Sequence, residues 1–174
     1  VTKLVAAAEL ALKLNPKDAY AFDAIGNGYM AQGYYEFFKG QDPLPSWAKG
    51  KQAIEKAIQI APKFLWAIND LSLLYLANAK YLLERGKDPS PDVGKAVRLQ
   101  SHAIELFVDY LNSYSSLIST YAIQAVYDKD HGKDPAILLE SSSAVFRKLM
   151  LINDKFVPGY IGVLNSYVPA VMYR

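Results

Sequence analysis

The segment 128–134 concentrates carboxylates around a histidine, and these are side chains that bind metal ions. It does not match a calcium-binding loop, because Gly132 falls one place early and Leu139 stands where a bidentate Glu is required. The chain has two histidines, His102 and His131, so no transition-metal cluster is evident. We expect no metal site and interpret the segment as the end of a helix, because the same turn occurs twice elsewhere.

No group of side chains in the sequence has the spacing of a catalytic site. The serines at 141–143 have no base near them in the sequence. Gly26-x-Gly28 is predicted to lie within a helix, whereas a phosphate-binding loop would follow a strand. The carboxylates of the expected shorter helices are scattered, at Glu55, Glu105 and Glu140. We therefore expect that this chain is not an enzyme and needs no cofactor.

The composition limits the classes of partner. Of the 174 residues, 52% are hydrophobic, and 19 basic residues stand against 17 acidic ones without a separate basic block, so we expect no nucleic-acid partner. No apolar run approaches the ~18 residues of a membrane span, so we expect no membrane partner. The absence of cysteine fits a reducing compartment, and we expect a cytoplasmic protein. Because the sequence lacks an initiator Met and begins within a helical pattern, we also expect a piece of a longer protein.

One stretch recurs along the chain at a fixed interval. Its copies begin 46 residues apart, at Leu14, Ile60, Leu106 and Ile152. A second marker, Gly-x-Asp-Pro, keeps the same step and begins at Gly40, Gly86 and Gly132. Two unrelated markers in one register identify an internal repeat.

Each repeat is predicted to contain a long helix followed by a shorter one. Apolar residues at three- and four-residue spacing predict a helix over 1–14, ended by Asn15-Pro16, and a long helix from Asp18 to Lys39. The shorter helices are expected at about 47–60, 92–107 and 136–152. A last helix from about Lys155 should be kinked near its end by Pro169.

The Gly-x-Asp-Pro marker has the chemistry of a helix end followed by a helix start. The glycine supplies the left-handed residue that closes a helix, and the basic residue before it meets the negative end of the helix dipole. The aspartate can cap the next helix, and the proline presets its first-turn dihedral. The basic residues are Lys39, Arg85 and His131, and the aspartates are Asp42, Asp88 and Asp134.

Large side chains recur at fixed positions of the long helices. The columns are Tyr29, Tyr75, Tyr121 and Tyr167; Tyr35, Tyr81 and Tyr127; Phe22, Ile68, Tyr114 and Tyr160; and Ile25, Leu71, Leu117 and Val163. We expect the last two columns to be buried, and small residues of the shorter helices to mark close helix contacts, at Gly50, Ala96 and Ser142. Helix pairs that cannot bury an apolar stripe alone bury it by stacking, so we predict an all-α, right-handed solenoid of helical hairpins with about eight helices.

These columns resemble the tetratricopeptide repeat (TPR), whose helices carry Trp-x2-Leu-Gly-x2-Tyr and then Ala-x3-Phe-x2-Ala before a Pro. The matching residues of the first unit are Phe22, Ile25, Gly26 and Tyr29, followed by Gly50, Ile54, Ala57 and Pro62. The resemblance implies a single TPR-like array over 1–174. Its parts are a half unit 1–16, units 17–62, 63–108 and 109–154, and a half unit 155–174.

The repeat departs from the family in its length. The family period is about 34 residues, so about 12 residues are added in each copy, between Tyr29 and Gly50 in the first. We assign them to a longer first helix and the Gly-x-Asp-Pro turn. The family glycine is lost after the first unit, and Val108 replaces the last connecting proline. Elongated arrays of this kind are also similar to the repeat regions that follow the kinase domain of some bacterial serine/threonine kinases, although this sequence contains no kinase motif.

The resemblance implies a binding site on the long helices, which in the family line a concave wall that binds extended peptides or partner helices. The corresponding positions here are Tyr20, Asp23, Asn27, Met30, Trp66, Asn69, Leu73, Asn112, Ser115, Ser119 and Asn165, with Leu76, Ala122, Ile161 and Val168 beside them. The asparagines offer donors and acceptors suited to a peptide backbone. Alternatively, these are ordinary polar residues that face solvent.

The resemblance also restricts the partner of this predicted scaffold. The family clamps doubly charged chaperone C-terminal tails with Lys and Arg, but Asp23 and Ser116 stand at those two places, so we do not expect that ligand. We expect a neutral or mildly apolar protein or peptide anchored by Tyr20 and Trp66, although Trp66 could equally pack between helices. The alternatives are a structural spacer that self-associates end to end, a regulatory region of a larger signalling enzyme such as a protein kinase, and a small-molecule sensor with a closed pocket.

Overall fold

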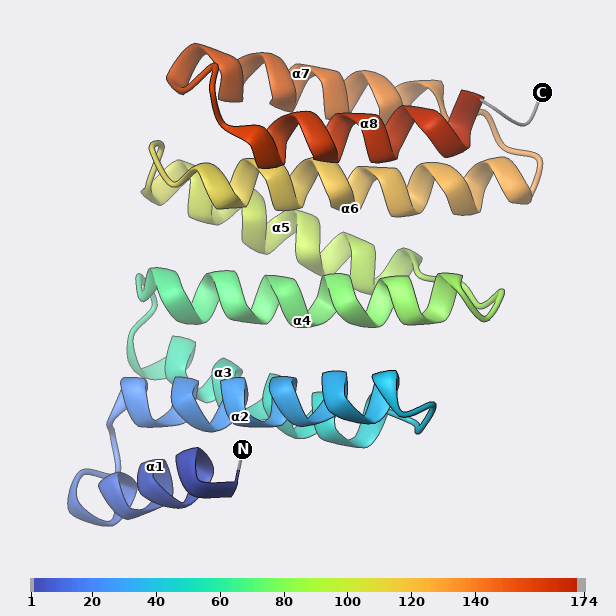
Figure 1. Cartoon of the computed structure of the whole chain (residues 1–174). Coiled ribbons are helices and arrows are strands. Elements are labelled where there is room, and N and C mark those ends of the chain that lie inside the picture. The colour runs from blue at the N-terminus through green and yellow to red at the C-terminus, as the bar shows by residue number, and fades with distance from the viewer. Residues whose placement is uncertain (1, 172–174) are drawn as a thin grey trace. The chain divides into compact units, whose positions relative to one another are not determined.

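The computed structural model describes the backbone of residues 2–171 and the side chains of residues 3–165. Within this part of the chain every regular element is an α-helix, and there are eight (Figure 1). They are α1 (Thr2–Leu14), α2 (Ala19–Phe38), α3 (Leu44–Ile60), α4 (Leu65–Leu83), α5 (Ser90–Leu106), α6 (Leu111–Asp130), α7 (Ala136–Ile152) and α8 (Val157–Val171). The all-α prediction and the expected number of helices are confirmed.

The helices alternate in length as the repeat predicts. The long helices α2, α4 and α6 have 20, 19 and 20 residues, and the shorter helices α3, α5 and α7 each have 17. The side chains of Tyr167, Val168 and Pro169 lie outside the described residues, so the fourth tyrosine of the column, the last wall position and the kink in α8 stay predictions.

The three Gly-x-Asp-Pro turns share one geometry. Their glycines are left-handed, with φ of 73°, 65° and 75° at Gly40, Gly86 and Gly132. In each turn the N–H after the glycine reaches the carbonyl five residues back, from Gln41 to Glu36 (2.8 Å), from Lys87 to Leu82 (2.9 Å) and from Lys133 to Asp128 (2.8 Å). This is the Schellman ending, which satisfies helix carbonyls that have no partner within the helix.

The aspartate of each turn starts the next helix. Its carboxylate accepts from the N–H two residues later: from Leu44 at Asp42 (3.1 Å), from Ser90 at Asp88 (2.9 Å) and from Ala136 at Asp134 (2.9 Å). The proline between them therefore occupies the N-cap position, and each helix begins one residue later than an aspartate N-cap would give. Side-chain and backbone hydrogen bonds from Ser90 also lower the pKa of Asp88.

Near the end of each long helix, a tyrosine stacks on the basic residue that follows it by four positions. The Arg85 guanidinium lies 3.6 Å from the ring centroid of Tyr81, and the Lys39 ammonium lies 5.8 Å from that of Tyr35. In the third copy the His131 ring lies 4.0 Å from the Tyr127 ring. The column and the basic residue thus form one cation–π or stacked pair that recurs with the turn.

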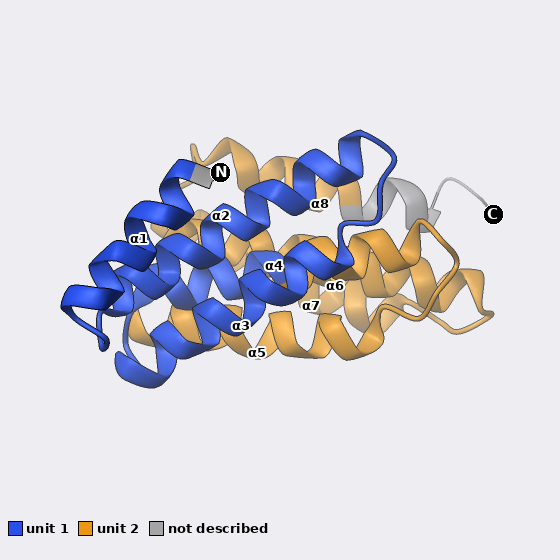
Figure 2. Ribbon diagram, turned by 90° about the horizontal axis from the view of Figure 1, so that it is seen from below, with its two compact units in different colours: residues 1–74 blue, residues 75–174 orange. Residues whose placement is uncertain are grey.

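The chain divides within α4 into two compact units, Val1–Leu74 and Tyr75–Arg174, which are coloured separately in Figure 2. In the first unit α1 packs on α2, and α2 packs on α3. In the second unit α6 packs on α5, α7 and α8, and α7 packs on α8. Each unit therefore joins long helices to the shorter helices next to them in the sequence.

In the first unit α2 and α3 approach each other closely through glycine. A Cβ added at Gly50 would lie 3.1 Å from the carbonyl oxygen of Gly26 and 3.1 Å from a methyl group of Leu74. The indole of Trp47 is also buried here, occupies the space beside Gly33, and donates to the carbonyl of Met30 (3.3 Å). The close contact predicted at Gly50 is therefore present.

The second unit has its core between α6, α7 and α8. Tyr114, Ile118 and Leu149 form its buried centre. The small positions Ala96 and Ser142 are also buried, as their expected role in close helix contacts requires. Apolar side chains that are partly buried pack around the centre: Ile104, Leu111, Val145, Phe146, Met150, Phe156 and Val163.

Replacing the glycine of one turn should destabilise the fold, whereas replacing a helical glycine nearby should stabilise it. Gly86→Ala forces alanine into left-handed backbone, and we expect the free energy of unfolding to fall by about 1 kcal/mol. Gly94→Ala lies within α5, where the only nearby atom is the flexible Arg98 side chain at 3.7 Å, and should raise it by about 0.5–1 kcal/mol. Urea unfolding followed by circular dichroism measures both, and changes of the same sign would contradict the assignment of the turn.

Candidate functional site

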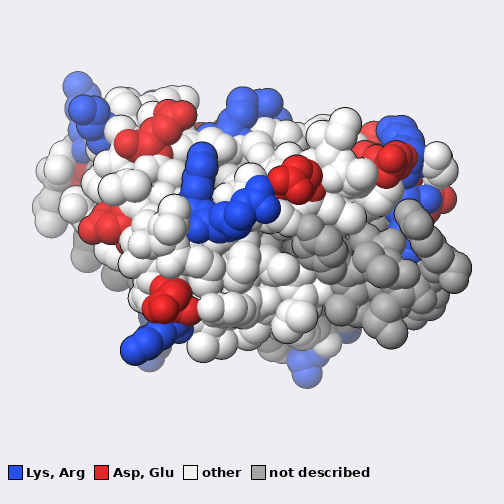
Figure 3. Space-filling view, turned by 90° about the horizontal axis from the view of Figure 1, so that it is seen from above, with Lys and Arg blue, Asp and Glu red and all other residues white. Residues whose placement is uncertain are grey.

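The described surface has several hollows, and its charged side chains are scattered. On the face drawn in Figure 3, Lys and Arg side chains are interspersed with Asp and Glu and separated by uncharged atoms. The predicted wall positions gather at two places, a groove in the second unit and a polar cluster with an aromatic hollow in the first.

A groove in the second unit lies on the long helices α4 and α6 and on α8, and we call it the α4/α6/α8 groove. Its volume is about 590 Å³. Four of the positions implied by the resemblance meet there: Leu76, Ser119, Ala122 and Asn165. The rest of its lining is Lys80, Leu83, Glu84, Ile123 and Val126, and an ion pair of 4.0 Å joins Lys80 to Glu84. The groove is thus mainly apolar, with charged and amide groups at its edges.

The serines of α6 are oriented by their own helix. Ser119 donates to the carbonyl of Ser115 (3.0 Å), and Ser115 donates to the carbonyl of Asn112 (3.0 Å). Because each hydroxyl hydrogen is used in this way, each hydroxyl oxygen remains as an acceptor. Asn112 and Asn165 are exposed.

An aromatic hollow in the first unit joins the starts of α2 and α4. Tyr20 and Trp66 both line it and are 71% and 55% exposed, so more than half of Trp66 is not packed between helices. The Tyr20 ring lies 4.5 Å from the ring of Phe64. The hollow has a volume of about 610 Å³ and is completed by Ala19, Ala61, Pro62, Lys63 and Leu65.

One helical turn further along the same two helices lies a polar cluster, the Asp23–Asp70 pair with its two asparagines. Asn27 Nδ2 donates to Asp70 Oδ2 (2.7 Å) and lies 3.3 Å from Asp23 Oδ2, so its amide bridges α2 and α4. Asn69 Nδ2 donates to Asp70 Oδ1 (3.0 Å). Asp23 and Asn69 are each 8% exposed. Asn27 and Asn69 therefore hold the two carboxylates and do not project as free amides.

The surroundings of Asp23 disfavour the ionised form of its carboxyl group. Burial, and secondly the charge of Asp70, raise its pKa from 3.8 to about 7. No charged side chain of α1 or α3 contributes to this shift among the described residues. Its Oδ1 atom is buried and has no hydrogen-bond partner in the described part of the chain.

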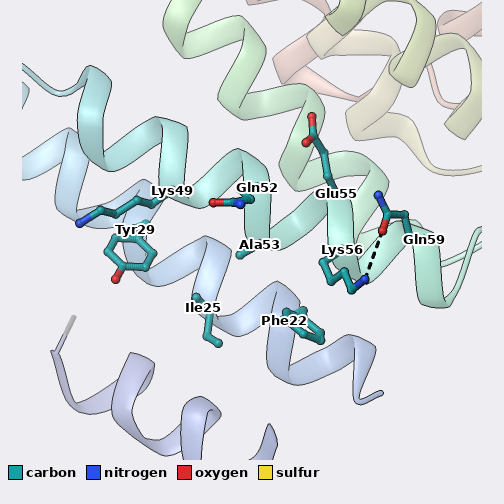
Figure 4. A pocket seen from close by; sticks show the side chains of 9 residues that line it. All are labelled: Phe22, Ile25, Tyr29, Lys49, Gln52, Ala53, Glu55, Lys56 and Gln59. Carbon is teal, nitrogen blue, oxygen red and sulfur yellow. Dashed lines mark hydrogen bonds between the residues drawn. The ribbon is translucent and has the colours of Figure 1, made fainter. Parts of the chain in front are cut away.

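A third hollow, shown in Figure 4, lies between α2 and α3 and has a volume of about 560 Å³. Phe22, Ile25 and Tyr29 line it and are half-buried, so the predicted burial fails at Phe22 and Ile25. Their counterparts in the next copy are buried, at Ile68 and Leu71 as predicted, and at Tyr75. The opposite wall comes from α3, with Lys49, Gln52, Ala53, Glu55, Lys56 and Gln59. Tyr160, the last member of the Phe22 column, is 45% exposed.

A lysine covers the first tyrosine column in two copies. Lys49 lies 5.4 Å from the ring centroid of Tyr29, and Lys95, which is 46 residues later, lies 4.9 Å from that of Tyr75. These two tyrosines therefore share a lysine neighbour, although Tyr29 is half-buried and Tyr75 is buried. Ser141 stands at the lysine position of the third copy.

Sequence reasoning missed Asp70, which belongs to the polar cluster. The available signal was its place directly after Asn69, and in the structure its Oδ2 accepts from Asn27 of α2. Met30 and Leu73 are half-buried, and Met30 takes part through its carbonyl, which accepts from the Trp47 indole. A buried Gln100–Thr120 hydrogen bond of 3.0 Å between α5 and α6 was also missed, since Gln100 stands where the family has an aromatic residue.

In the described residues no group of three or more His, Asp or Glu could hold a metal ion. Among the described helices, none combines the length and the hydropathy that crossing a membrane needs. No protein-family model matches the chain, and a comparison with curated proteins finds no match. The resemblance to the TPR therefore depends on the repeat motifs themselves.

The raised pKa of Asp23 predicts a stability that falls as the pH rises. Between about pH 4 and 7 the folded state keeps a proton that the unfolded state has lost, so the free energy of unfolding decreases through this window. The loss is about 2–4 kcal/mol and is complete above the folded-state pKa. Asp23→Asn should remove this component and be more stable than the wild type at pH 8.

Urea unfolding at pH 5 and pH 8 measures this difference. Glu9→Gln is the matched control, because it removes one exposed carboxylate from α1 in the same unit. An equal pH dependence in the wild type and Asp23→Asn would show that the Asp23 carboxyl is not perturbed.

Proposed function

We propose that this chain is a TPR-like array of helical hairpins whose long helices bind a protein partner, as an extended peptide or a helix. The observation that carries the proposal is the α4/α6/α8 groove, because the long helices α4 and α6, together with α8, contribute to one mainly apolar hollow. A rigid helical surface binds without first having to be ordered, which favours affinity from few contacts.

The residues at the groove support a polypeptide ligand. Apolar side chains of α4 and α6 can accept a hydrophobic side chain of the partner, and the Asn165 amide and serine oxygen of Ser119 can pair with its backbone. In the first unit the exposed Tyr20 and Trp66 have the amphipathic character of interface anchors. Balanced charge, with 19 basic and 17 acidic residues, favours a protein over a polyanion.

Filling the groove should weaken binding. We expect Ser119→Tyr to weaken the binding of peptides selected by display against the intact chain by at least about tenfold, since the ring would occupy the hollow. Ser141→Tyr is the matched control: Ser141 also donates to the carbonyl four residues earlier, Ile137, but does not line the groove. Isothermal titration calorimetry measures both variants, and peptides bound equally by Ser119→Tyr and the wild type would refute the groove.

A second candidate function is self-association, and the exposed apolar side chains of α8 favour it. Val157, Ile161 and Leu164 are 61%, 52% and 60% exposed, and uncovered apolar patches are typical of interfaces. In this alternative the array is a spacer that stacks end to end.

Light scattering over a concentration series tests the alternative. Self-association predicts a mass that rises with concentration and returns to that of the monomer in Ile161→Glu, because a charge cannot be buried unpaired at an apolar contact. A constant monomeric mass in the wild type would exclude self-association.

A further inference from the structure

The hollow between α2 and α3, which we call the α2/α3 hollow, leaves an apolar stripe of α2 uncovered. Phe22, Ile25 and Tyr29 are three and four residues apart, so their side chains lie on one face of α2, and all three are half-buried. In the next two copies the first two of these positions are buried, at Ile68, Leu71, Tyr114 and Leu117. The first copy therefore presents an apolar surface that the repeat elsewhere covers.

The α3 wall of this hollow carries two lysines without an acidic partner. Lys49 and Lys56 are exposed, and neither forms an ion pair with a residue in the described part of the chain. The Lys49 ammonium lies over the Tyr29 ring, and the Lys56 ammonium lies 3.5 Å from Gln59 Oε1. Glu55 also lines the hollow, but its carboxylate points away from the apolar stripe (Figure 4). The edge beside the stripe is thus cationic and complements a ligand with negative groups.

The two lysines and the apolar stripe have the same length. Lys49 and Lys56 are seven residues apart on α3, which is two helical turns or about 10 Å, and Phe22 and Tyr29 are seven apart on α2. Lys49 lies at the Tyr29 end of the stripe and Lys56 at the Phe22 end (Figure 4). A matching ligand therefore has two negative groups about 10 Å apart and apolar groups between them.

We propose that the α2/α3 hollow is a docking site for an acidic amphipathic helix of a protein partner. Carboxylates seven residues apart on that helix lie on one face and two turns apart, so they reach both lysines, and the apolar side chains between them meet the stripe. An extended chain covers about 10 Å in three residues, and side chains three apart in a strand point to opposite faces. The spacing of the lysines therefore favours a helix over an extended segment.

This site goes beyond the proposed function. It lies in the first unit and shares no lining residue with the α4/α6/α8 groove. Its partner is acidic, whereas the sequence led us to expect a neutral or mildly apolar one.

Ala53 leaves room for the partner helix. Its small side chain lines the hollow from α3, whereas Leu99 stands at the same position of the next copy, within α5. Leucine at position 53 would occupy the space of the partner's apolar side chains. Because α5 accommodates leucine at this position, we expect Ala53→Leu to fold.

Nuclear magnetic resonance of the intact 15N-labelled chain tests the site with a helical peptide. The probe is an acetylated and amidated alanine-based peptide of about 15 residues, stapled on its outer face, with Glu at positions i and i+7 and Leu at i+3 and i+4. We expect saturable shifts of the side-chain amide signals of Gln52 and Gln59, which line the hollow. Binding should weaken at least about fivefold when both Glu are replaced by Lys, or when an unstapled peptide with a central proline is used.

Variants of the chain separate the site from a general effect on the fold. Ala53→Leu and Lys49→Gln should each weaken the probe at least about fivefold. Lys95→Gln is the matched control and should leave binding unchanged, because Lys95 also lies over a tyrosine ring, that of Tyr75, but does not line the hollow. The backbone amide spectrum reports whether each variant is folded.

The proposal is overturned by equal binding of the Lys-substituted peptide, by undiminished binding to Ala53→Leu or Lys49→Gln, or by the absence of saturable shifts. Equal binding of the proline-containing peptide would show that the occupant is not a helix, and would overturn it too. If Ser119→Tyr still weakens the selected peptides while the helical probe fails, the α2/α3 site is wrong and the proposed function stands.

Discussion

Packing of a shorter helix through a small, buried residue is the constraint on which the described fold depends. At Gly50 the α3 backbone meets Gly26 of α2, and the corresponding positions Ala96 and Ser142 are also small and buried. A larger side chain at these crossings would separate the two helices and open the core. The contact orients the long helix, and with it the side chains that the proposed function uses.

The ends of the long helices are fixed by a second recurring device. A left-handed glycine closes the long helix, and the aspartate two residues later starts the following helix. The basic residue directly before the glycine stacks on a tyrosine four residues earlier, as Arg85 does on Tyr81. These interactions are local, so each copy can form them without help from distant parts of the chain. Each long helix is thereby given a defined end.

Much of the fold could be predicted because local chemistry repeats: the glycine turns are left-handed as expected, and the small residues Gly50, Ala96 and Ser142 are buried. The site was less predictable because its groups meet across helices. Asp70 follows Asn69 in the sequence, yet only the packing of α4 on α2 places it against Asn27 and reveals that the asparagines hold carboxylates. Likewise, the half-burial of Phe22 depends on the hollow beside α3, which a column of similar residues does not reveal.

The central claim is that the long helices, rather than the shorter ones, form the surface that a partner occupies. A crystal structure of the chain with a peptide selected by display tests this claim most directly. The account predicts density for the peptide along the α4/α6/α8 groove, against Leu76, Ser119 and Ile123. Density for the peptide on α3, α5 or α7, with the groove empty, would contradict it.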